Sequence, residues 1–540
     1  MQSGISACAL ACMLLLPGHV MAQVPSQIDP GLQRQRIQDM ERQRAIEERA
    51  RQVEVPALQG EAGTMAVQID QDAVFVVQTI QFSPSRFLDA AELEALARPY
   101  VGREIRFADL NELLAQINAL YERAGQVTAR AIIPPQTLND GLLKILLVEA
   151  RVDEVTWEGE PRRVDPSFYD RRLGIEQGAV LDAPALMADI QRLNATTPGP
   201  QVSASLAPGQ TFGTTRVNLQ AFEPDRLQWM AFANNHGNVG SGRTQYGGTF
   251  VWFSPTGAAD SLTALAVLSA DSRFGSLRYS RPVNRHNGVV YVEAGANTME
   301  ITEGPYSDLN IEGDSQIYSA GYDHPWWINP KWLLRGGVGY VQQGSETTIE
   351  GLPLSDTDIG EFTLKGTAEY RSAPWYIRYD QRIRQASTDN RISGESGNYV
   401  LFNGAGYLSR VFGERYELVG RLAWQRSNDA ESLPSALYFQ FGGVGVTRGY
   451  DPGVIASPHG IAVNLEGYWH LNERWQTFLF YDYGKATELG TRDVTLQSAG
   501  AGVNFIWSKR FSVNLLVAST MEDVVPDQDG SQVLLQLQAR

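Results

Sequence analysis

The chain has 540 residues, enough for roughly two to four domains, and carries a formal net charge of −16 with a pI near 5.0. This acidic balance argues against nucleic acid as a partner. Both cysteines, Cys8 and Cys12, lie near the start of the chain. This position excludes a disulfide scaffold and a cysteine-ligated metal site in the rest of the protein.

The first segment has the features of an export signal. Its apolar run ALACMLLLPGHVMA ends in Val20-Met21-Ala22, with small residues at positions −3 and −1 of a cleavage site. We therefore expect residues 1–22 to be a secretory signal peptide. No later segment reaches about 18 consecutive apolar residues, so no transmembrane helix is predicted. An exported chain can still span a membrane as a closed β-barrel.

Residues 26–52 have the composition of a helix but almost no apolar stripe, because the few apolar residues are scattered among charges of both signs. Such a helix cannot bury one face in a core. Two interpretations stay open at this point: a solvated arm, or a helix lodged in a polar cavity. Residues 53–73 contain proline and glycines and are expected to form a linker.

Residues 74–150 are predicted to form a small α+β domain in the order β-α-α-β-β. The first helix begins at Asp89 with Glu92 three residues later, which resembles a capping box. The second has leucines at helical spacing and ends at Gly125. Residues 151–223 repeat the same order, which indicates two tandem modules. The alternative is one irregular α/β domain.

From residue 224 to residue 540, segments of about 8 to 14 residues alternate at period two. In WYIRYDQRIR, Trp375, Ile377 and Tyr379 share one face, and charged residues occupy the other. A soluble sandwich alternates too, but its interior has limited volume. A membrane barrel with its apolar side outward fits an exported chain better. We expect about sixteen antiparallel strands, with one long insertion over residues 428–458.

Two short motifs lie in and after this insertion. Residues 442–453 read GGVGVTRGYDPG and fit neither of the phosphate-binding spacings G-x-G-x-x-G and G-x-x-x-x-G-K. Turn residues follow the arginine. On a later strand, the sequence FYDYG begins at Phe480. If Trp475, Leu479 and Tyr481 face lipid, parity directs Asp482 into the lumen, where its carboxylate can hold a guanidinium by two hydrogen bonds.

These features together resemble the outer-membrane transporters of two-partner secretion, the TpsB family of the POTRA-barrel superfamily. The family's V-R-G-[YF] motif matches Arg448, Gly449 and Tyr450, with Thr447 where valine is usual, and its F-x-D-x-G motif matches Phe480, Asp482 and Gly484. The resemblance implies a plug helix over residues 23–52, two POTRA domains and a 16-stranded barrel. It also implies that the insertion folds back into the barrel, where these six residues anchor it. One departure is the chain end, QVLLQLQAR, where such barrels commonly end in an aromatic residue.

The implied function is a pore in the outer membrane of a Gram-negative bacterium, with its POTRA domains in the periplasm. It would recognise an unfolded exoprotein of the haemolysin, adhesin or contact-inhibition-toxin type (TpsA) and translocate it without nucleotide hydrolysis. Other implied partners are outer-membrane lipids and the barrel-assembly machinery. The sequence contains no G-x-S-x-G, H-E-x-x-H or C-x-x-C motif, so we expect no enzyme, catalytic residue, cofactor or metal site. Two alternatives are a barrel-assembly insertase and a cation-selective porin.

Overall fold

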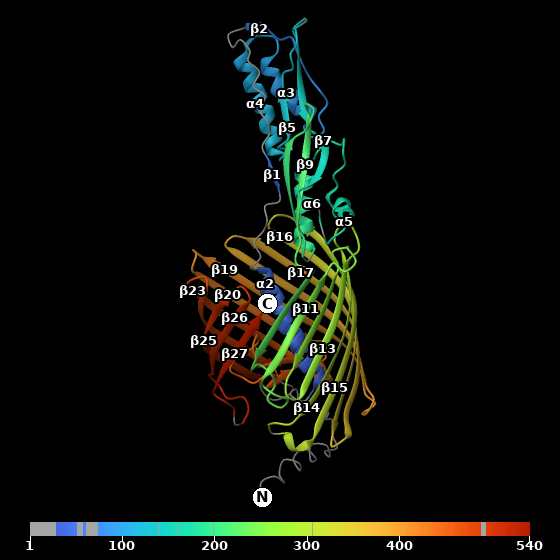
Figure 1. Ribbon diagram of the computed structural model, residues 1–540, viewed down its shortest axis with the longest axis vertical. Helices are drawn as coiled ribbons and strands as arrows, with labels where there is room; N and C mark the ends of the chain where they lie inside the picture. Colours follow the sequence, from blue (N-terminus) through green and yellow to red (C-terminus); the bar gives the residue numbers. More distant parts are fainter. Residues whose placement is uncertain are drawn as a thin grey trace. The chain divides into compact units, whose positions relative to one another are not determined.

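The computed structural model describes residues 29–50, 58–60, 74–138, 140–159, 161, 163–197, 199–304, 306–487, 493–526 and 528–540. The expected signal peptide and most of the expected linker lie outside these residues. The chain divides into two compact units: one contains the N-terminal helix and nearly all of the chain from Asp225 onward, and the other contains Glu54–Pro224 (Figure 1). No helix among the described residues is both long and apolar enough to cross a bilayer.

The first unit is a closed antiparallel barrel of sixteen strands, which confirms the predicted fold class. Its first eight strands are β10 (Leu227–Asn234), β11 (Gln245–Phe253), β12 (Ser261–Leu268), β13 (Ser272–Pro282), β14 (Val289–Ile301), β15 (Ile311–Ile328), β16 (Trp332–Ile349) and β17 (Leu352–Ser372). The other eight are β18 (Trp375–Asn390), β19 (Ser396–Phe412), β20 (Tyr416–Ser427), β23 (His459–His470), β24 (Trp475–Thr487), β25 (Asp493–Ser508), β26 (Phe511–Thr520) and β27 (Ser531–Ala539).

Period-two alternation explains why these segments form a barrel wall. On β24, Leu479 is 70% exposed on the outer face, whereas Asp482 is fully buried. Outward apolar and inward polar side chains are the arrangement that lipid requires. The ring closes between β10 and β27 through four residue pairs, from Ala231↔Ala539 to Asn234↔Gln536. The last strand therefore pairs on both sides although the chain does not end in an aromatic residue.

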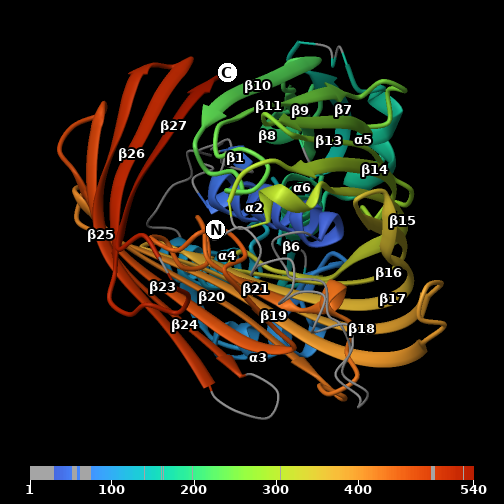
Figure 2. The ribbon, with the colours of Figure 1, turned by 90° about the horizontal axis from the view of Figure 1, so that it is seen from below.

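The polar N-terminal segment forms one helix, α2 (Pro30–Ala50), which lies inside the ring of strands (Figure 2). Its 21 residues correspond to a length of about 32 Å. Residues 23–28 and 51–52 of the expected range lie outside the described residues. The Asp29 carboxylate caps its start, accepting hydrogen bonds from the amides of Gly31 and Leu32. The first turn is buried, so a helix without an apolar stripe is accommodated by a polar lumen.

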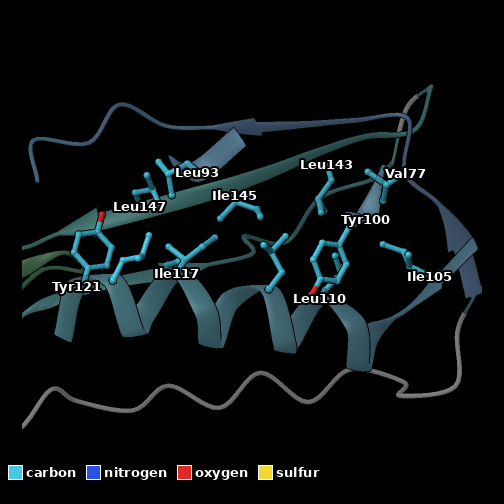
Figure 3. Close-up of a cluster of buried hydrophobic side chains, with 13 residues drawn as sticks. Val77, Leu93, Tyr100, Ile105, Leu110, Ile117, Tyr121, Leu143, Ile145 and Leu147 are labelled. Atoms are coloured by element: carbon cyan, nitrogen blue, oxygen red, sulfur yellow. The ribbon is translucent and has the colours of Figure 1, made fainter. Parts of the chain in front are cut away.

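The first module contains β2 (Val74–Val76), β3 (Thr79–Phe82), α3 (Ala90–Ala97), η1 (Arg98–Tyr100), β4 (Glu104–Arg106), α4 (Phe107–Arg123), β5 (Ala129–Ile132) and β6 (Leu142–Glu149). Its sheet has the order β3-β6-β5. Side chains of α4 such as Ile117 point toward β6, where Leu143 and Ile145 complete the core (Figure 3). The module begins with two short strands, β2 and β3, in place of the single first strand of the predicted order β-α-α-β-β. Val77 between them is buried, and its carbonyl accepts from the amide of Gly102.

The second module has the predicted order β-α-α-β-β, without the additional β2, η1 and β4 of the first. Its elements are β7 (Arg151–Trp157), α5 (Pro166–Leu173), α6 (Ala183–Thr196), β8 (Gln201–Pro208) and β9 (Thr214–Phe222). Its sheet gains a further strand from outside the module, giving the order β1-β8-β9-β7. This strand is β1 (Leu58–Gly60), which pairs in parallel with β8. Part of the expected linker is therefore a strand and not a loop.

Both modules are closed by the same kind of contact, a glutamate at the end of the last strand. In the first module, Glu149 accepts hydrogen bonds from the amide of Arg86 and from the hydroxyl of Tyr121 at 3.0 Å. In the second module, Glu223 accepts from the amide of Arg163 and from the hydroxyl of Tyr169 at 3.0 Å. In each case the carboxylate ties the strand end to the loop that precedes the first helix.

Candidate functional site

The insertion between β20 and β23 is an ordered loop, over residues 428–458. It contains a short 3-10 helix, η3 (Ser435–Leu437), and a hairpin of β21 (Phe439–Phe441) and β22 (Ile455–Ser457). Its glycines provide backbone conformations that other residues rarely adopt: Gly442 has φ +91° and Gly449 has φ +90°. Phe441 and Tyr450 are fully buried in an apolar cluster between loop and barrel wall. The loop therefore packs as part of the interior.

The hairpin places Arg448 against Asp482 on β24. Nε of Arg448 donates to Oδ2 of Asp482 at 2.8 Å, and Nη2 donates to Oδ1 at 2.6 Å. The backbone amide of Arg448 donates to the same carboxylate at 2.9 Å. Three charge-assisted or amide hydrogen bonds thus converge on one inward carboxylate. Asp482, which parity directed into the lumen, and Arg448, which the family resemblance assigned to the anchor, lie in direct contact.

The guanidinium has a second carboxylate partner that sequence reasoning did not select. Nη1 of Arg448 donates to Oε1 of Glu466 on β23 at 2.5 Å, and Glu466 is 3% exposed. Asn464, two residues earlier, donates to Asp482 at 2.9 Å. Period-two alternation along β23 puts Glu466 and Asn464 on the inward face. That parity was the signal available in the sequence.

The other motif residues surround the arginine. The ring of Phe480 lies under the guanidinium, with 3.7 Å between the Arg448 Cζ and the ring centroid, which is a cation–π contact. The hydroxyl of Tyr450 lies 2.9 Å from the carbonyl oxygen of Glu522 and 3.0 Å from that of Gln497. The tyrosine therefore connects the loop to the barrel wall beside the arginine.

Close backbone approach explains the glycine of the second motif. A Cβ atom built on Gly484 would lie 2.9 Å from Cδ1 of Phe441 and 3.0 Å from Cγ2 of Thr447, both on the loop. Contacts this short force a neighbour to move. Only glycine at this position lets the loop lie flat on β24.

The electrostatics of the site favour a charged arginine. Burial opposes its charge, but the hydrogen bonds and negative charges of Asp482 and Glu466 compensate for burial. Among the described residues, no cluster of three or more histidine, cysteine or acidic side chains is arranged to hold a metal ion. The arrangement can hold a loop in place.

The helix α2 contacts both the barrel wall and this loop. Toward the wall, Arg49 donates to Glu369 at 3.0 Å and Arg421 donates to Glu47 at 2.8 Å. Toward the loop, Arg36 donates to the Gln440 side chain at 2.7 Å. Polar contacts on two sides position the helix. Ile37 adds an apolar contact with Phe232 and Phe274 of the barrel wall.

Beside the helix the lumen retains a cavity of about 1400 Å³. Charged side chains of both signs line it, from α2 as well as from the strands. They include Glu41, Arg42, Arg44, Glu293, Glu361, Lys365, Arg382 and Arg384. The helix therefore occupies the lumen without filling it.

Comparison with known proteins identifies the architecture. Residues 75–150 match the ShlB-type POTRA domain, and residues 213–505 match the haemolysin secretion/activation protein ShlB/FhaC/HecB, over just more than half of the chain. The chain belongs to the ShlB/FhaC/HecB family. It is an outer-membrane transporter of the two-partner secretion type, a family that carries exoproteins across the outer membrane.

Curated relatives cover most of the chain. The heme/hemopexin transporter protein HuxB of Haemophilus influenzae is 21% identical over 481 residues, 83% of each chain. The outer membrane transporter CdiB of Escherichia coli is 27% identical over 468 residues, 81% of this chain and 76% of the relative.

Solved structures show the same fold. CdiB from Escherichia coli has a TM-score of 0.71 at 19% identity and covers 96% of this chain and 99% of its own. BamA from Haemophilus ducreyi lacking POTRA domains 1–3 has a TM-score of 0.52 at 15% identity, covering 86% of this chain and 100% of its own. At these identities the structures establish the fold alone.

Proposed function

We propose that this transporter recognises an unfolded exoprotein of the TpsA type in the periplasm, through its POTRA modules, and passes it through the barrel lumen to the cell surface. The observation that carries the proposal is a closed barrel whose polar lumen holds a helix of its own chain, α2. A segment lodged in the lumen by polar contacts can act as a plug that leaves when a client enters.

The size of the lumen supports an unfolded client. An α-helix with its side chains is about 10–12 Å wide, and the cavity beside α2 adds about 1400 Å³. This space suits an extended chain and is too narrow for a folded domain. Because its walls carry both signs of charge, the lumen suits polypeptides of varied sequence.

Strand addition is the docking mode that the modules support. An extended client segment can add to a sheet edge through main-chain hydrogen bonds that tolerate varied side chains. In the first module, β3 and β5 are the edge strands of the described sheet. In the second, β1 already pairs with the outer edge of β8. The other edge strand of that sheet is β7. A client can therefore add to the first module or to β7, or displace β1.

The loop anchor would keep the pore in a defined state. The bidentate contact between Arg448 and Asp482, closed over by Tyr450, would hold the long loop inside the barrel while the client passes. Gly449, Phe480 and Gly484 would serve this anchor by backbone conformation, cation–π contact and close approach. We assign no catalytic role to these residues, and client folding outside the cell would draw the chain outward without nucleotide hydrolysis.

Deletion of the first module tests the proposal. The variant without residues 74–150 should lose surface display of the exoprotein partner, identified by genome neighbourhood. It should keep a heat-modifiable barrel in the outer membrane, as assayed by gel mobility, and it should conduct ions in planar bilayers. Normal export by this variant would contradict docking on the first module.

A further inference from the structure

Glu466 on β23 is shared between two guanidinium groups. Its Oε1 accepts from Nη1 of Arg448 at 2.5 Å, and its Oε2 pairs with Nη1 of Arg421 at 2.7 Å. Tyr468 also donates to Oε2 at 2.6 Å. With 3% of its side chain exposed, Glu466 has little water to replace a lost partner. The position of either arginine therefore affects the hold on the other.

Arg421 in turn connects this carboxylate to the helix in the lumen. Its Nη2 and Nε atoms lie 2.8 Å and 3.1 Å from Oε1 of Glu47 on α2. The contacts form a continuous chain of alternating charges, in which Glu466 lies between two cations. In order from helix to loop anchor, the chain is Glu47, Arg421, Glu466, Arg448 and Asp482.

We propose that Arg421 and Glu466 are positioning residues that couple the presence of α2 in the lumen to the anchoring of the Arg448 loop. When α2 leaves, Arg421 loses the Glu47 carboxylate and retains only Glu466 within this chain. It then draws more strongly on Glu466, whose hold on Arg448 weakens. The loop is released from one of its two carboxylates at the moment when the client takes the place of the helix.

This inference rests on the proposed plug role of α2 and deepens it. Coupling between two sites is reciprocal, so loosening the loop must also loosen the helix. The expected range for such coupling is about 5- to 150-fold in an equilibrium. Departure of α2 would therefore release the loop without any contact between the client and the loop.

Direct contacts between the helix and the loop are a competing route of coupling, which the test must distinguish from the route through Arg421. Gln43 donates to the carbonyl of Gly445 at 3.3 Å, and the Gln440 side chain donates to the carbonyl of Leu32 at 2.8 Å. These direct contacts could couple the two elements without Arg421. The ion pair of Arg49 with Glu369 provides the matched control, because it holds α2 to the wall at 3.0 Å outside the chain to Arg448.

The test is hydrogen exchange of the full-length protein in detergent micelles, without exoprotein, followed by mass spectrometry of peptides covering residues 30–50 and 442–453. Glu47→Gln should accelerate exchange of the loop peptide about tenfold. Arg49→Gln should accelerate exchange of the helix peptide. At matched helix exchange, the loop peptide should exchange more slowly in Arg49→Gln than in Glu47→Gln.

The decisive comparison uses Arg421→Met, which removes the connecting cation but leaves Arg448, Glu466 and Asp482 in place. In this background Glu47→Gln should have no further effect on loop exchange. Arg421→Lys offers a second background, since a point charge cannot bridge two carboxylates as a planar fork does. Heat modifiability confirms that each barrel is folded.

Two outcomes would overturn the proposal. One is that Glu47→Gln leaves the hydrogen exchange of the loop peptide unchanged. The other is that Glu47→Gln changes loop exchange equally with and without Arg421, which would assign the coupling to Gln43 and Gln440. Because no exoprotein is present, these outcomes are independent of secretion. If the wild-type transporter failed to export its exoprotein partner, the proposed function would be contradicted, but the exchange result would still stand.

Discussion

Arg448 and Asp482 meet through two side-chain hydrogen bonds, of 2.8 Å and 2.6 Å, and a third from the arginine amide at 2.9 Å. The two residues are 34 positions apart and belong to a loop and to a barrel strand. Both are buried. Removing either partner leaves a charge in a site that water does not reach, which makes the pair sensitive to substitution.

Arg448→Ala and Asp482→Ala should each impair secretion without removing the barrel from the membrane. Breaking a buried pair by removing one partner typically costs about 3–5 kcal/mol. Because both substitutions remove the same interaction, their effects should be far from additive in a double-mutant cycle of secretion. Arg448→Lys should also reduce secretion, since it cannot form the bidentate contact. Additive losses would show that the two residues act separately.

Deleting residues 23–52 should raise single-channel conductance in planar bilayers and increase antibiotic entry into cells. The reason is that α2 occupies a lumen which otherwise contains water and charged side chains. Secretion should remain largely intact, because a plug blocks a pore but does not recognise a client. Unchanged conductance would mean that the helix does not obstruct the pore.

Gly484→Ala should loosen the loop, because the added methyl group would lie 2.9 Å from the Phe441 ring. Overpacking of this kind typically costs about 1–3 kcal/mol. Protease cleavage of the loop in detergent-solubilised barrels measures the effect. Gly467→Ala on the adjacent strand β23 is the matched control, since a Cβ atom there would meet nothing within 4 Å. Equal cleavage in the two variants would contradict close approach as the role of Gly484.

The second module should lose stability in alkaline solution. Burial, followed by the charge and hydrogen bond of Glu223, raises the pKa of Tyr169 above its ordinary value of 10.0. A raised pKa stabilises the fold fully below pH 10 and progressively less as the pH rises further. Hydrogen exchange of residues 151–223 between pH 8 and pH 11, corrected for intrinsic rates, measures this loss.

Tyr169→Phe serves as the control for that pH dependence. It should weaken the module at neutral pH, by about 1.5–3 kcal/mol for a hydrogen bond to a charged group, and should flatten the decline above pH 10. A decline that is equally steep without the hydroxyl would assign the alkaline sensitivity to other groups.

Alternation made the barrel and part of the site predictable. A strand at period two commits every second residue to the lumen, so parity alone is sufficient to place Asp482 and Glu466 on the inner face, where both are buried. The glycines around Arg448 likewise indicated a tight loop. Alternation alone did not indicate which inward carboxylates the loop arginine reaches. Asp482 was assigned to the anchor through the family resemblance, and Glu466 was missed because its contact depends on the path of the loop. The pairing of Arg448 with Glu466 is therefore a product of tertiary structure.

One other feature escaped prediction for a related reason. The strand β1 has only three residues, Leu58–Gly60, and no room for a periodic pattern. Its pairing depends on the free edge of β8, which is more than a hundred residues later in the chain.

The pairing of β1 with β8 has a kinetic consequence for the helix that precedes it. Only seven residues separate Ala50 from Leu58, a span of at most about 27 Å even when fully extended. While β1 stays paired, a displaced α2 remains tethered by these seven residues. Its effective concentration at the lumen is then in the millimolar range. Return of the helix to an empty lumen is then an intramolecular step, independent of protein abundance. The pore would reseal itself after each client without help from another protein.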